Sequence, residues 1–292
     1  MITQLPKGAL PDPPDPRDFK AEFLGAPKVD WHTPFQLPVP PDSDQAQADC
    51  CVGEAWSYYH WQLKGYTFSV RSVFAYIAQA YGAFIRDGGW RITSFGQETA
   101  VEAPDPNPKT PQNMRDKTGL CLDLAKDDTE QNYFVLPDNS IDGVAWGVKN
   151  YKGVVFGVTG SDAGWQNMSE PRPPKTGEST WGHALYAMGY HLHDGKKCII
   201  AKSSWCNTGI KEHHIKEDYF LTGNTFNAWT LIPKEQQPMP KKFLINDNGK
   251  IGVLILEGFT GTVAFAKTEA ALAELKDAFE VPADAQTINL PQ

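Results

Sequence analysis

The sequence lacks the features that would place it in a membrane or send it across one. Its 292 residues contain no run of about 18 apolar residues, the length that a membrane-spanning helix needs. The first residues, MITQLPKGALPDPPDPRDF, carry prolines where a signal peptide needs an uninterrupted apolar core. We therefore expect no transmembrane segment and no export signal. The default expectation is a cytoplasmic protein, or a virion-associated one if a phage encodes it.

Positive charge is also scarce. The chain has 27 Lys and Arg against 35 Asp and Glu, which gives a net charge of −8 and a pI near 5.4. No lysine or arginine run and no basic helix occurs anywhere in the sequence. Because nucleic acids and anionic membranes attract basic surfaces, neither is an expected partner.

Cysteines are few, and their number is odd. The five are Cys50, Cys51, Cys121, Cys198 and Cys206, so at least one thiol is unpaired within the chain. Without an export signal, we expect all five to be reduced. Cys50 and Cys51 are adjacent, and this pair gives the clearest indication of function in the sequence.

The chain falls into a proline-rich lead-in, a helical part, a strand part and an appendage. Residues 1–43 contain ten prolines, which favours an extended segment laid over a surface. Hydrophobic spacing predicts helices at 51–63 and 69–85, loops with short helices at 91–128, and strands at 153–159, 183–191 and 196–205.

These elements predict an α+β fold. The expected core domain is 44–235, with a helical lobe at about 44–128 and a β lobe at about 129–235. Residues 240–292 read as a small ββα-type appendage that turns at Asp-Asn-Gly and carries a helix beginning near Thr268. A protein partner is one expected use of this appendage.

The stretch DQAQADCCVGEAW, residues 44–56, carries a pattern for nucleophilic chemistry. Cys51 starts the first predicted helix, and a helix N-terminus beside a histidine lowers the pKa of a thiol. Gln45 can loop back to donate a hydrogen bond to an oxyanion, with Gln47 as the alternative donor. Cys50 reads as a small buried residue, with redox control of its neighbour as the alternative.

Several segments, taken in order, resemble the papain-like cysteine peptidases, in a bacterial or phage-like variant. The matching segments are PDPRDF (14–19), VDW (29–31), Gln45 with CVGEAW (51–56), RDGGW (86–90), GHALYAMGY (182–190) and KSSW (202–205), where the family usually has Lys-Asn-Ser-Trp. They span about residues 14–232.

The resemblance implies a two-lobed fold with a cleft between the lobes, and a role for each matching residue. These roles are Cys51 as nucleophile, His183 as general base and acid, Gln45 as oxyanion donor, Gly88 and Gly89 as partners of the substrate backbone, and Trp205 as a cover over the partner of the histidine. Ser203 departs from the usual asparagine. Its hydroxyl can accept the imidazole N–H but orients the ring less firmly.

The register of the predicted hairpin provides a check on the pair His183 and Ser203. A three-residue loop from His193 to Gly195 would put Ser203 diagonally beside His183 on one face of the sheet. A two-residue loop would put Ser203 on the opposite face. The triad therefore requires the longer loop or a bulge.

No cofactor or metal is expected, although a zinc site is conceivable because imidazole and thiolate are good ligands. The residues with suitable side chains are His191, His193, Cys198, Cys206, His213 and His214, and their spacings match no CxxC or HExxH pattern. Glu54, one turn after Cys51, reads as an ordinary helix residue whose direction the sequence leaves open, although a carboxylate near a thiolate would oppose its formation.

The sequence thus predicts a cysteine endopeptidase that acts on a peptide or protein substrate. Two alternatives stay open, namely a papain-like binding or scaffold protein with little or no turnover, and an amidase or transglutaminase-like acyl transferase. Only 28 residues precede Val29, which is short for the helical propeptide of the family. We expect the lead-in to be a permanent strap across the surface instead of a removable inhibitor.

Overall fold

The computed structural model describes residues 8–15, 18, 28–137, 139–205 and 209–233 with their side chains, and the backbone of 241–247, 250–257, 260–265 and 287–289. By its contacts the chain divides into two compact units, Met1–Lys234 and Glu235–Gln292. Among the described residues, no helix has the length and apolar character needed to cross a bilayer. Cys206 and the helix predicted after Thr268 lie outside the described residues.

The helical half of the first unit begins with α1, Cys51–Lys64, as the sequence predicts. Gly65 ends the helix in the left-handed conformation, with φ of 84°, and its N–H bonds to the carbonyl of Trp61. The next helix, α2, spans Val70–Ile77, and its N-cap Ser69 accepts a hydrogen bond from the Ser72 N–H.

The second predicted helix, 69–85, is too long. The chain leaves the helix at Ala78, which has ψ of 128°, and residues Ala83–Phe84 form a short strand, β3. Gly82 has φ of 122°, which a helix cannot contain. This strand pairs in parallel with β1, Ala9–Leu10, so a distant part of the chain supplies the partner that ends the helical run.

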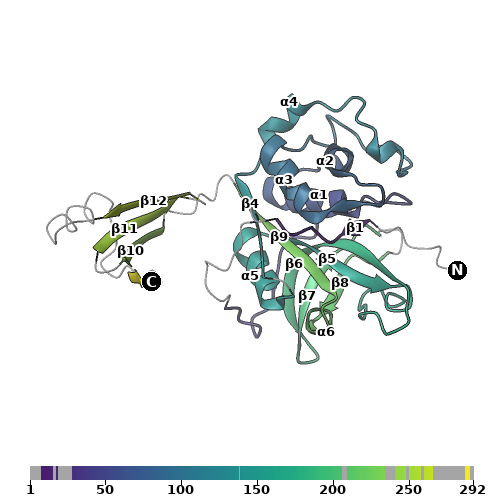
Figure 1. Cartoon of the computed structure of the whole chain (residues 1–292). Helices are drawn as coiled ribbons and strands as arrows, with labels where there is room; N and C mark the ends of the chain where they lie inside the picture. The colour runs from purple at the N-terminus through teal and green to yellow at the C-terminus, as the bar shows by residue number, and fades with distance from the viewer. Residues whose placement is uncertain are drawn as a thin grey trace. The chain divides into compact units, whose positions relative to one another are not determined.

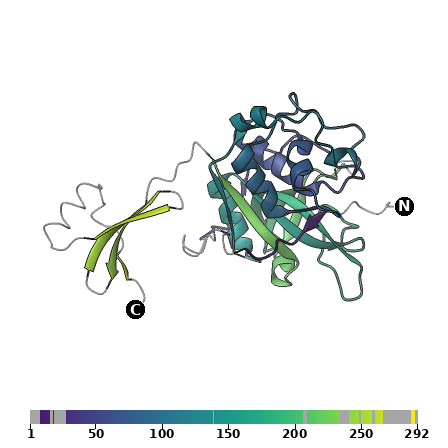
Figure 2. The ribbon, with the colours of Figure 1, turned by 45° about the horizontal axis from the view of Figure 1, so that its top comes forward.

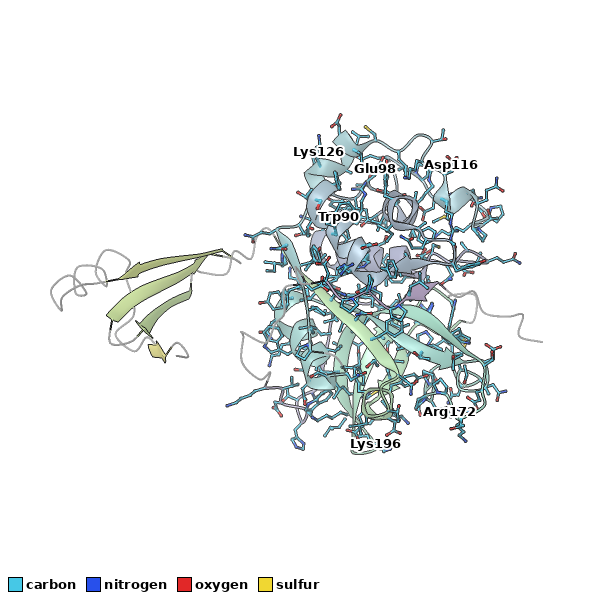
Figure 3. The ribbon with its side chains drawn as sticks, in the orientation of Figure 1. Trp90, Glu98, Asp116, Lys126, Arg172 and Lys196 are labelled. Carbon is cyan, nitrogen blue, oxygen red and sulfur yellow. The ribbon has the colours of Figure 1, made fainter. Side chains whose placement is uncertain are left out.

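The helical half continues with α3, Ile85–Phe95, and the short α4, Leu122–Ala125. The 3-10 turns Asn113–Arg115 and Lys126–Asp128 complete it. Figure 1 shows these helices grouped on one side of the first unit, with the sheet on the other. In Figure 3, Trp90, Glu98, Asp116 and Lys126 mark the helical half, and Arg172 and Lys196 mark the strand half.

The strand half is an antiparallel sheet in the order β4-β9-β5-β6-β7-β8, with β2 paired to β6. The bounds are β2 Phe35–Gln36, β4 Asn132–Val135, β5 Val154–Ser161, β6 Thr180–His193, β7 Lys196–Lys202, β8 His213–Lys216 and β9 Thr225–Ile232. Two helices belong to this half, α5 Ile141–Tyr151 and α6 Glu217–Leu221. The mixture of helices and antiparallel strands is the predicted α+β class.

Aromatic side chains join the two halves. The indole of Trp56 in α1 stacks on the ring of Tyr59 with centroids 5.9 Å apart, and Tyr59 packs on Tyr186 of β6 at 5.6 Å. The buried Tyr59 hydroxyl is 2.6 Å from the hydroxyl of Thr230 in β9. Because aromatic burial supplies much of the energy of a protein core, this stack holds α1 firmly against the sheet.

The C-terminal unit contains a sheet in the order β12-β11-β10-β13. Strands β10 Lys241–Asp247, β11 Lys250–Glu257 and β12 Thr260–Phe265 are antiparallel, and β13 Thr287–Asn289 runs parallel to β10. Asp247 pairs with Lys250 in the first hairpin, and the remaining residues of the turn predicted at Asp-Asn-Gly lie outside the described residues. The unit has more strands than the ββα-type appendage expected from sequence.

Gly88 and Gly89 lie inside α3, where both are buried. Their backbone groups belong to the helix, so they are not free to pair with an extended peptide. A side chain at Gly88 would meet the Trp56 indole, whose Cδ1 would be 2.1 Å from the added Cβ. This position contradicts the substrate-binding role expected for the pair, and we do not retain it.

Gly88→Ala should therefore lower stability, because its methyl group would overlap the Trp56 ring. We expect a loss of about 1–3 kcal/mol in the free energy of unfolding, measured by denaturant titration. Gly89→Ala is the matched control, because the nearest atoms would be 3.2 Å from the added Cβ. Alanine also has a higher helix propensity than glycine. Equal stability of the two variants would contradict the packing role of Gly88.

Candidate active site

Cys51 occupies the first position of α1 and is fully buried. Its thiol lies at the backbone N–H of Ala184, the residue after His183. This contact joins the start of α1, in the helical half, to β6, in the strand half. A site built from both halves requires such a contact. Cys50 precedes the helix as its N-cap residue and is also buried. Burial and the Glu54 carboxylate raise the pKa of Cys50 well above its usual value.

His183 lies in β6 and is fully buried. Its Nε2 is 3.0 Å from the Oγ of Ser203. Its Nδ1 makes no hydrogen bond within the described part of the chain. Trp205 stacks flat on the imidazole, with centroids 3.8 Å apart and 13° between the planes. The ring is thus fixed by one polar contact and one aromatic face, and one nitrogen is left for proton transfer.

A bulge in β6 brings Ser203 to the same face as His183. The hairpin between β6 and β7 has the two-residue loop Asp194–Gly195, because His193 pairs with Lys196. The register then shifts by one residue between Ala187 and Gly189. Since side chains alternate along a strand, this extra residue reverses the facing that the short loop would give. Of the two routes to the triad, the structure uses the bulge.

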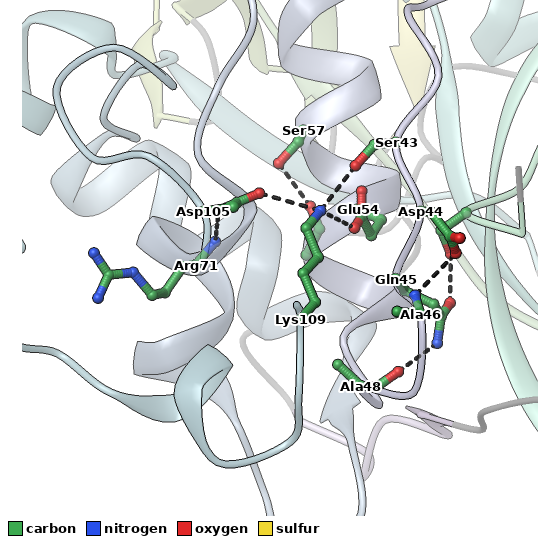
Figure 4. A network of polar contacts seen from close by, with 12 residues as sticks. Ser43, Asp44, Gln45, Ala46, Ala48, Glu54, Ser57, Arg71, Asp105 and Lys109 are labelled. Atoms are coloured by element: carbon green, nitrogen blue, oxygen red, sulfur yellow. Dashed lines mark hydrogen bonds and ion pairs between the residues drawn. The ribbon is translucent and has the colours of Figure 1, made fainter. Parts of the chain in front are cut away.

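Gln45, in the segment that leads to Cys51, is fully buried, whereas Gln47 is exposed. The Gln45 Nε2 donates to the Ala48 carbonyl at 2.6 Å, and the side-chain oxygen accepts a hydrogen bond from the Ser204 hydroxyl. Figure 4 shows the first of these contacts beside the start of α1. The amide is therefore fixed in orientation, and its second N–H stays available as a donor. This geometry favours Gln45 over Gln47 as the oxyanion donor.

Glu54 points toward a lysine, which answers the question that the sequence left open. Its Oε1 is 2.7 Å from the Nζ of Lys109, and the same Nζ is 3.2 Å from Asp105 and 2.9 Å from Ser43 (Figure 4). Although burial lowers the pKa of Lys109, the carboxylates of Glu54 and Asp105 raise it more. The charged lysine offsets the effect that the Glu54 carboxylate would have on the nearby thiols.

Burial opposes the charged form of both candidate catalytic groups. Burial raises the pKa of the Cys51 thiol to about 12, and the N–H of Ala184 only partly offsets this. Burial also lowers the pKa of His183 well below its usual value, and the nearby His213 adds to the effect. Desolvation opposes the charged form of each group. A thiolate–imidazolium pair therefore requires access of water or substrate to this site.

The lead-in passes next to the candidate site, at residues adjacent in sequence to Cys51 and His183. Gly8 donates its N–H to the Gly182 carbonyl at 3.3 Å and accepts from the Ala83 N–H at 2.8 Å. A Cβ on Gly8 would be 2.1 Å from the Asp49 carbonyl, two residues before Cys51. Figures 1 and 2 both show β1 between the helices and the sheet. This part of the lead-in thus enters the space between the halves and does not lie on the outer surface.

Asp12 anchors the same segment farther along. Its carboxylate accepts the Trp229 indole N–H at 2.6 Å and the backbone N–H of Arg86 at 3.1 Å. Burial raises the pKa of Asp12 to about 6, and these hydrogen bonds limit the rise. The anchor ties the lead-in to both α3 and β9.

The sequence reasoning missed four positions that contact this segment of the lead-in, namely Asp49, Gly82, Ala83 and Gly182. A Cβ on Gly82 would be 2.0 Å from the Gly8 carbonyl, so the close approach of the two backbones requires glycine there. The signal available was Gly82 in AYGAF, six residues before the pair in RDGGW. Without the partner strand, nothing in the sequence distinguishes the two sites.

Of the residues singled out in the sequence, Cys51, His183, Ser203, Gln45 and Trp205 lie together at the junction of the halves. Gly88 and Gly89 do not join them. No metal-binding cluster includes any of these residues within the described ranges. The arrangement has the groups that acyl transfer needs, namely a thiol at a helix start, an imidazole with a positioned partner, and a fixed amide donor.

Comparison with known proteins gives matches only at the level of structure. No protein-family model matches the sequence, and no curated protein matches it significantly. Xylellain, a cysteine protease from Xylella fastidiosa, is 20% identical with a TM-score of 0.62, over 80% of this chain and 99% of that one. Procathepsin B S9 from Trypanosoma congolense is 11% identical with a TM-score of 0.60, over 78% and 87% of the two chains.

The bromelain protease from Ananas comosus, solved with the inhibitor E64, is 18% identical with a TM-score of 0.52. It covers 67% of this chain, and 94% of its own length is matched. Identities this low concern architecture and not residue roles. The resemblance inferred from sequence is thereby confirmed at the level of the fold: the chain has the papain-like fold of the cysteine proteases.

Proposed function

We propose that this protein is a cysteine peptidase in which Cys51 is the nucleophile and His183 the general base and acid. The observation that carries the proposal is the 3.0 Å contact between His183 Nε2 and Ser203 Oγ. His183 belongs to β6, and the next residue of that strand, Ala184, meets the Cys51 thiol. The contact with Ser203 leaves Nδ1 of the His183 ring to exchange a proton with the thiol. The papain-like fold supports a hydrolase of this class.

The reaction follows from these groups. His183 Nδ1 takes the proton of the Cys51 thiol, and the thiolate attacks the carbonyl carbon of the scissile bond. The Gln45 Nε2–H and the Cys51 backbone N–H donate to the oxyanion that forms. The imidazolium then protonates the leaving amine, the C–N bond breaks, and water hydrolyses the acyl-enzyme with His183 as base.

Ser203 is a positioning residue in this proposal. Its Oγ accepts the Trp205 backbone N–H at 3.3 Å, which fixes the oxygen beside His183 Nε2. That restraint compensates for part of the rotational freedom that a serine has and an asparagine lacks. The stacked Trp205 excludes water from the contact and strengthens it.

The substrate backbone would take the place of the lead-in at Gly8. Ala83 and Gly182 offer an N–H and a carbonyl from opposite halves, and Gly8 uses both. An extended peptide can make the same two hydrogen bonds. We infer that the protein with this segment in place is a latent form, and that substrate and lead-in compete.

The alternative of a binding module without turnover rests on Ser203 and on the lead-in next to the site. An amidase or transglutaminase-like transferase would use the same groups, and no observation of the described residues favours it. Peptide hydrolysis distinguishes an enzyme from a binding module. An amine acceptor added to the assay distinguishes acyl transfer from hydrolysis.

Cys51→Ala should abolish peptide hydrolysis, with a loss of about 10⁴-fold or more, because no other group replaces the nucleophile. An epoxide thiol probe should label the wild type at Cys51, and mass spectrometry of the labelled peptide would identify the residue. Cys50→Ala is the matched control and should retain labelling and turnover. Labelling that persists at the same rate in Cys51→Ala would exclude the nucleophile assignment.

Ser203→Ala should lower kcat by roughly tenfold to a hundredfold with little change in KM, because a hydrogen bond to a charged group contributes about 1.5–3 kcal/mol. The pH profile of probe labelling should show a lower pKa for His183, since its charged form loses an acceptor. Ser203→Asn should give a kcat equal to or higher than that of the wild type. If Ser203→Asn folds and neither it nor the wild type hydrolyses any peptide, the binding module is the better reading.

Gly8→Val should activate the protein, because a side chain there would overlap the Asp49 carbonyl and displace the lead-in. A clash of about 1–3 kcal/mol predicts roughly tenfold faster labelling of Cys51 and faster peptide cleavage. Pro14→Ala, an exposed change in the same segment, is the control. Equal labelling rates in the two variants would show that the segment does not limit access to the thiol.

A further inference from the structure

Three side chains suited to metal binding meet on one face of the strand half. His191 of β6 lies directly opposite Cys198 of β7, so both point to the same face. His214 of β8 pairs with Ile200, two residues along β7 from Cys198, which brings it to that face as well. The pairing of three strands assembles a group that sequence spacing did not indicate.

The separation of the two imidazole nitrogens in this group is close to that of a zinc site. The ligand atoms of His191, Cys198 and His214 all lie within 4.8 Å of one another, and His191 Nε2 is 3.0 Å from His214 Nδ1. Tetrahedral zinc, with bonds of about 2.0–2.1 Å to nitrogen and about 2.3 Å to sulfur, holds its ligand atoms roughly 3.3–3.7 Å apart. The two rings would need to separate by only about 0.3 Å.

The burial of the three residues suits a metal site that is closed on the sulfur side and open to solvent on the imidazole side. Cys198 is fully buried, whereas His191 and His214 are half-buried and reach the surface. Among the described residues, the hydrogen-bond contact of the Cys198 Sγ is a weak one, at 3.8 Å, with the Ile199 carbonyl. A metal ion can therefore enter from the imidazole side and take up a sulfur that has no strong partner to lose.

The surroundings of the group hold a balancing charge and a further histidine. The His193 ring lies 5.7 Å from that of His191 and 5.8 Å from that of His214, centroid to centroid. Its Nε2 is 3.1 Å from Glu170, and the other oxygen of Glu170 binds the Lys216 ammonium at 2.9 Å. Because Glu170 neutralises Lys216, the nearby positive charge opposes a bound cation less.

We propose that His191, Cys198 and His214 form a binding site for one Zn²⁺, with solvent as the fourth ligand. Binding forms one Zn–S and two Zn–N bonds, and the proton of the Cys198 thiol leaves to solvent. The hydrogen shared by the two imidazoles moves to the far nitrogen of its own ring. The ion would link β6, β7 and β8, and the site is independent of the peptidase chemistry proposed for Cys51.

Cobalt titration of the full chain tests the site, in the Cys51→Ala background so that the catalytic thiol cannot contribute. One equivalent of Co²⁺ should give the strong visible bands of a tetrahedral ion and a thiolate-to-cobalt charge-transfer band, and Zn²⁺ should displace both. Cys198→Ser should lose the charge-transfer band. His214→Ala should weaken binding at least about tenfold, in line with the loss of one of three protein ligands.

His32→Ala and Cys121→Ala are the controls, because both side chains are exposed and lie outside the group. Each should bind Co²⁺ as the Cys51→Ala protein does. Thermal unfolding gives a second measure, since a given Zn²⁺ concentration should raise the midpoint more in the controls than in His214→Ala. A charge-transfer band that survives in Cys198→Ser, or equal affinity in His214→Ala and His32→Ala, would overturn the proposal.

Discussion

The candidate site depends on one extra residue in β6. The β6–β7 hairpin closes with Asp194 and Gly195, both with positive φ, and this two-residue turn alone would direct Ser203 away from His183. The bulge between Ala187 and Gly189 reverses the facing, and the 3.0 Å contact follows. The Met188 carbonyl within the bulge accepts the Leu37 N–H at 2.8 Å. Part of the lead-in thereby holds the register on which the catalytic pairing relies.

The lead-in therefore does two different things along its length. Residues 35–37 pair with β6 beside the bulge, where a Cβ on Gly189 would be 2.8 Å from the Phe35 carbonyl. Residues 8–10 lie between the halves and bond to Ala83 and Gly182. The first contact is part of the sheet and stays with the fold. The contact of residues 8–10 uses hydrogen bonds that water or a peptide could replace. This part of the lead-in is therefore the part suited to release.

The order of segments predicted the fold, and it named most of the residues that meet at the candidate site, because those features are local or follow from strand pairing. The helix at Cys51 and the strands around His183 and Ser203 have clear periodicity, and the need for a bulge could be derived from the loop length. The fate of residues 78–89 could not be predicted, because β1, some 70 residues upstream, supplies the partner that ends α2. The residues around Cys198 were among the possible zinc ligands, but spacing did not show which of them meet, because non-local register assembles the cluster.

Burial couples the proposed chemistry to access. Desolvation raises the pKa of Cys51 and lowers that of His183, so the buried site favours a neutral thiol and a neutral imidazole. Both shifts have the same cause and should be relieved by the same event, entry of water or substrate. In the proposed latent form, release of Gly8 would admit water to the thiol and favour its ionisation. Such a form would need no separate switch, because the segment proposed to compete with the substrate would also disfavour the thiolate.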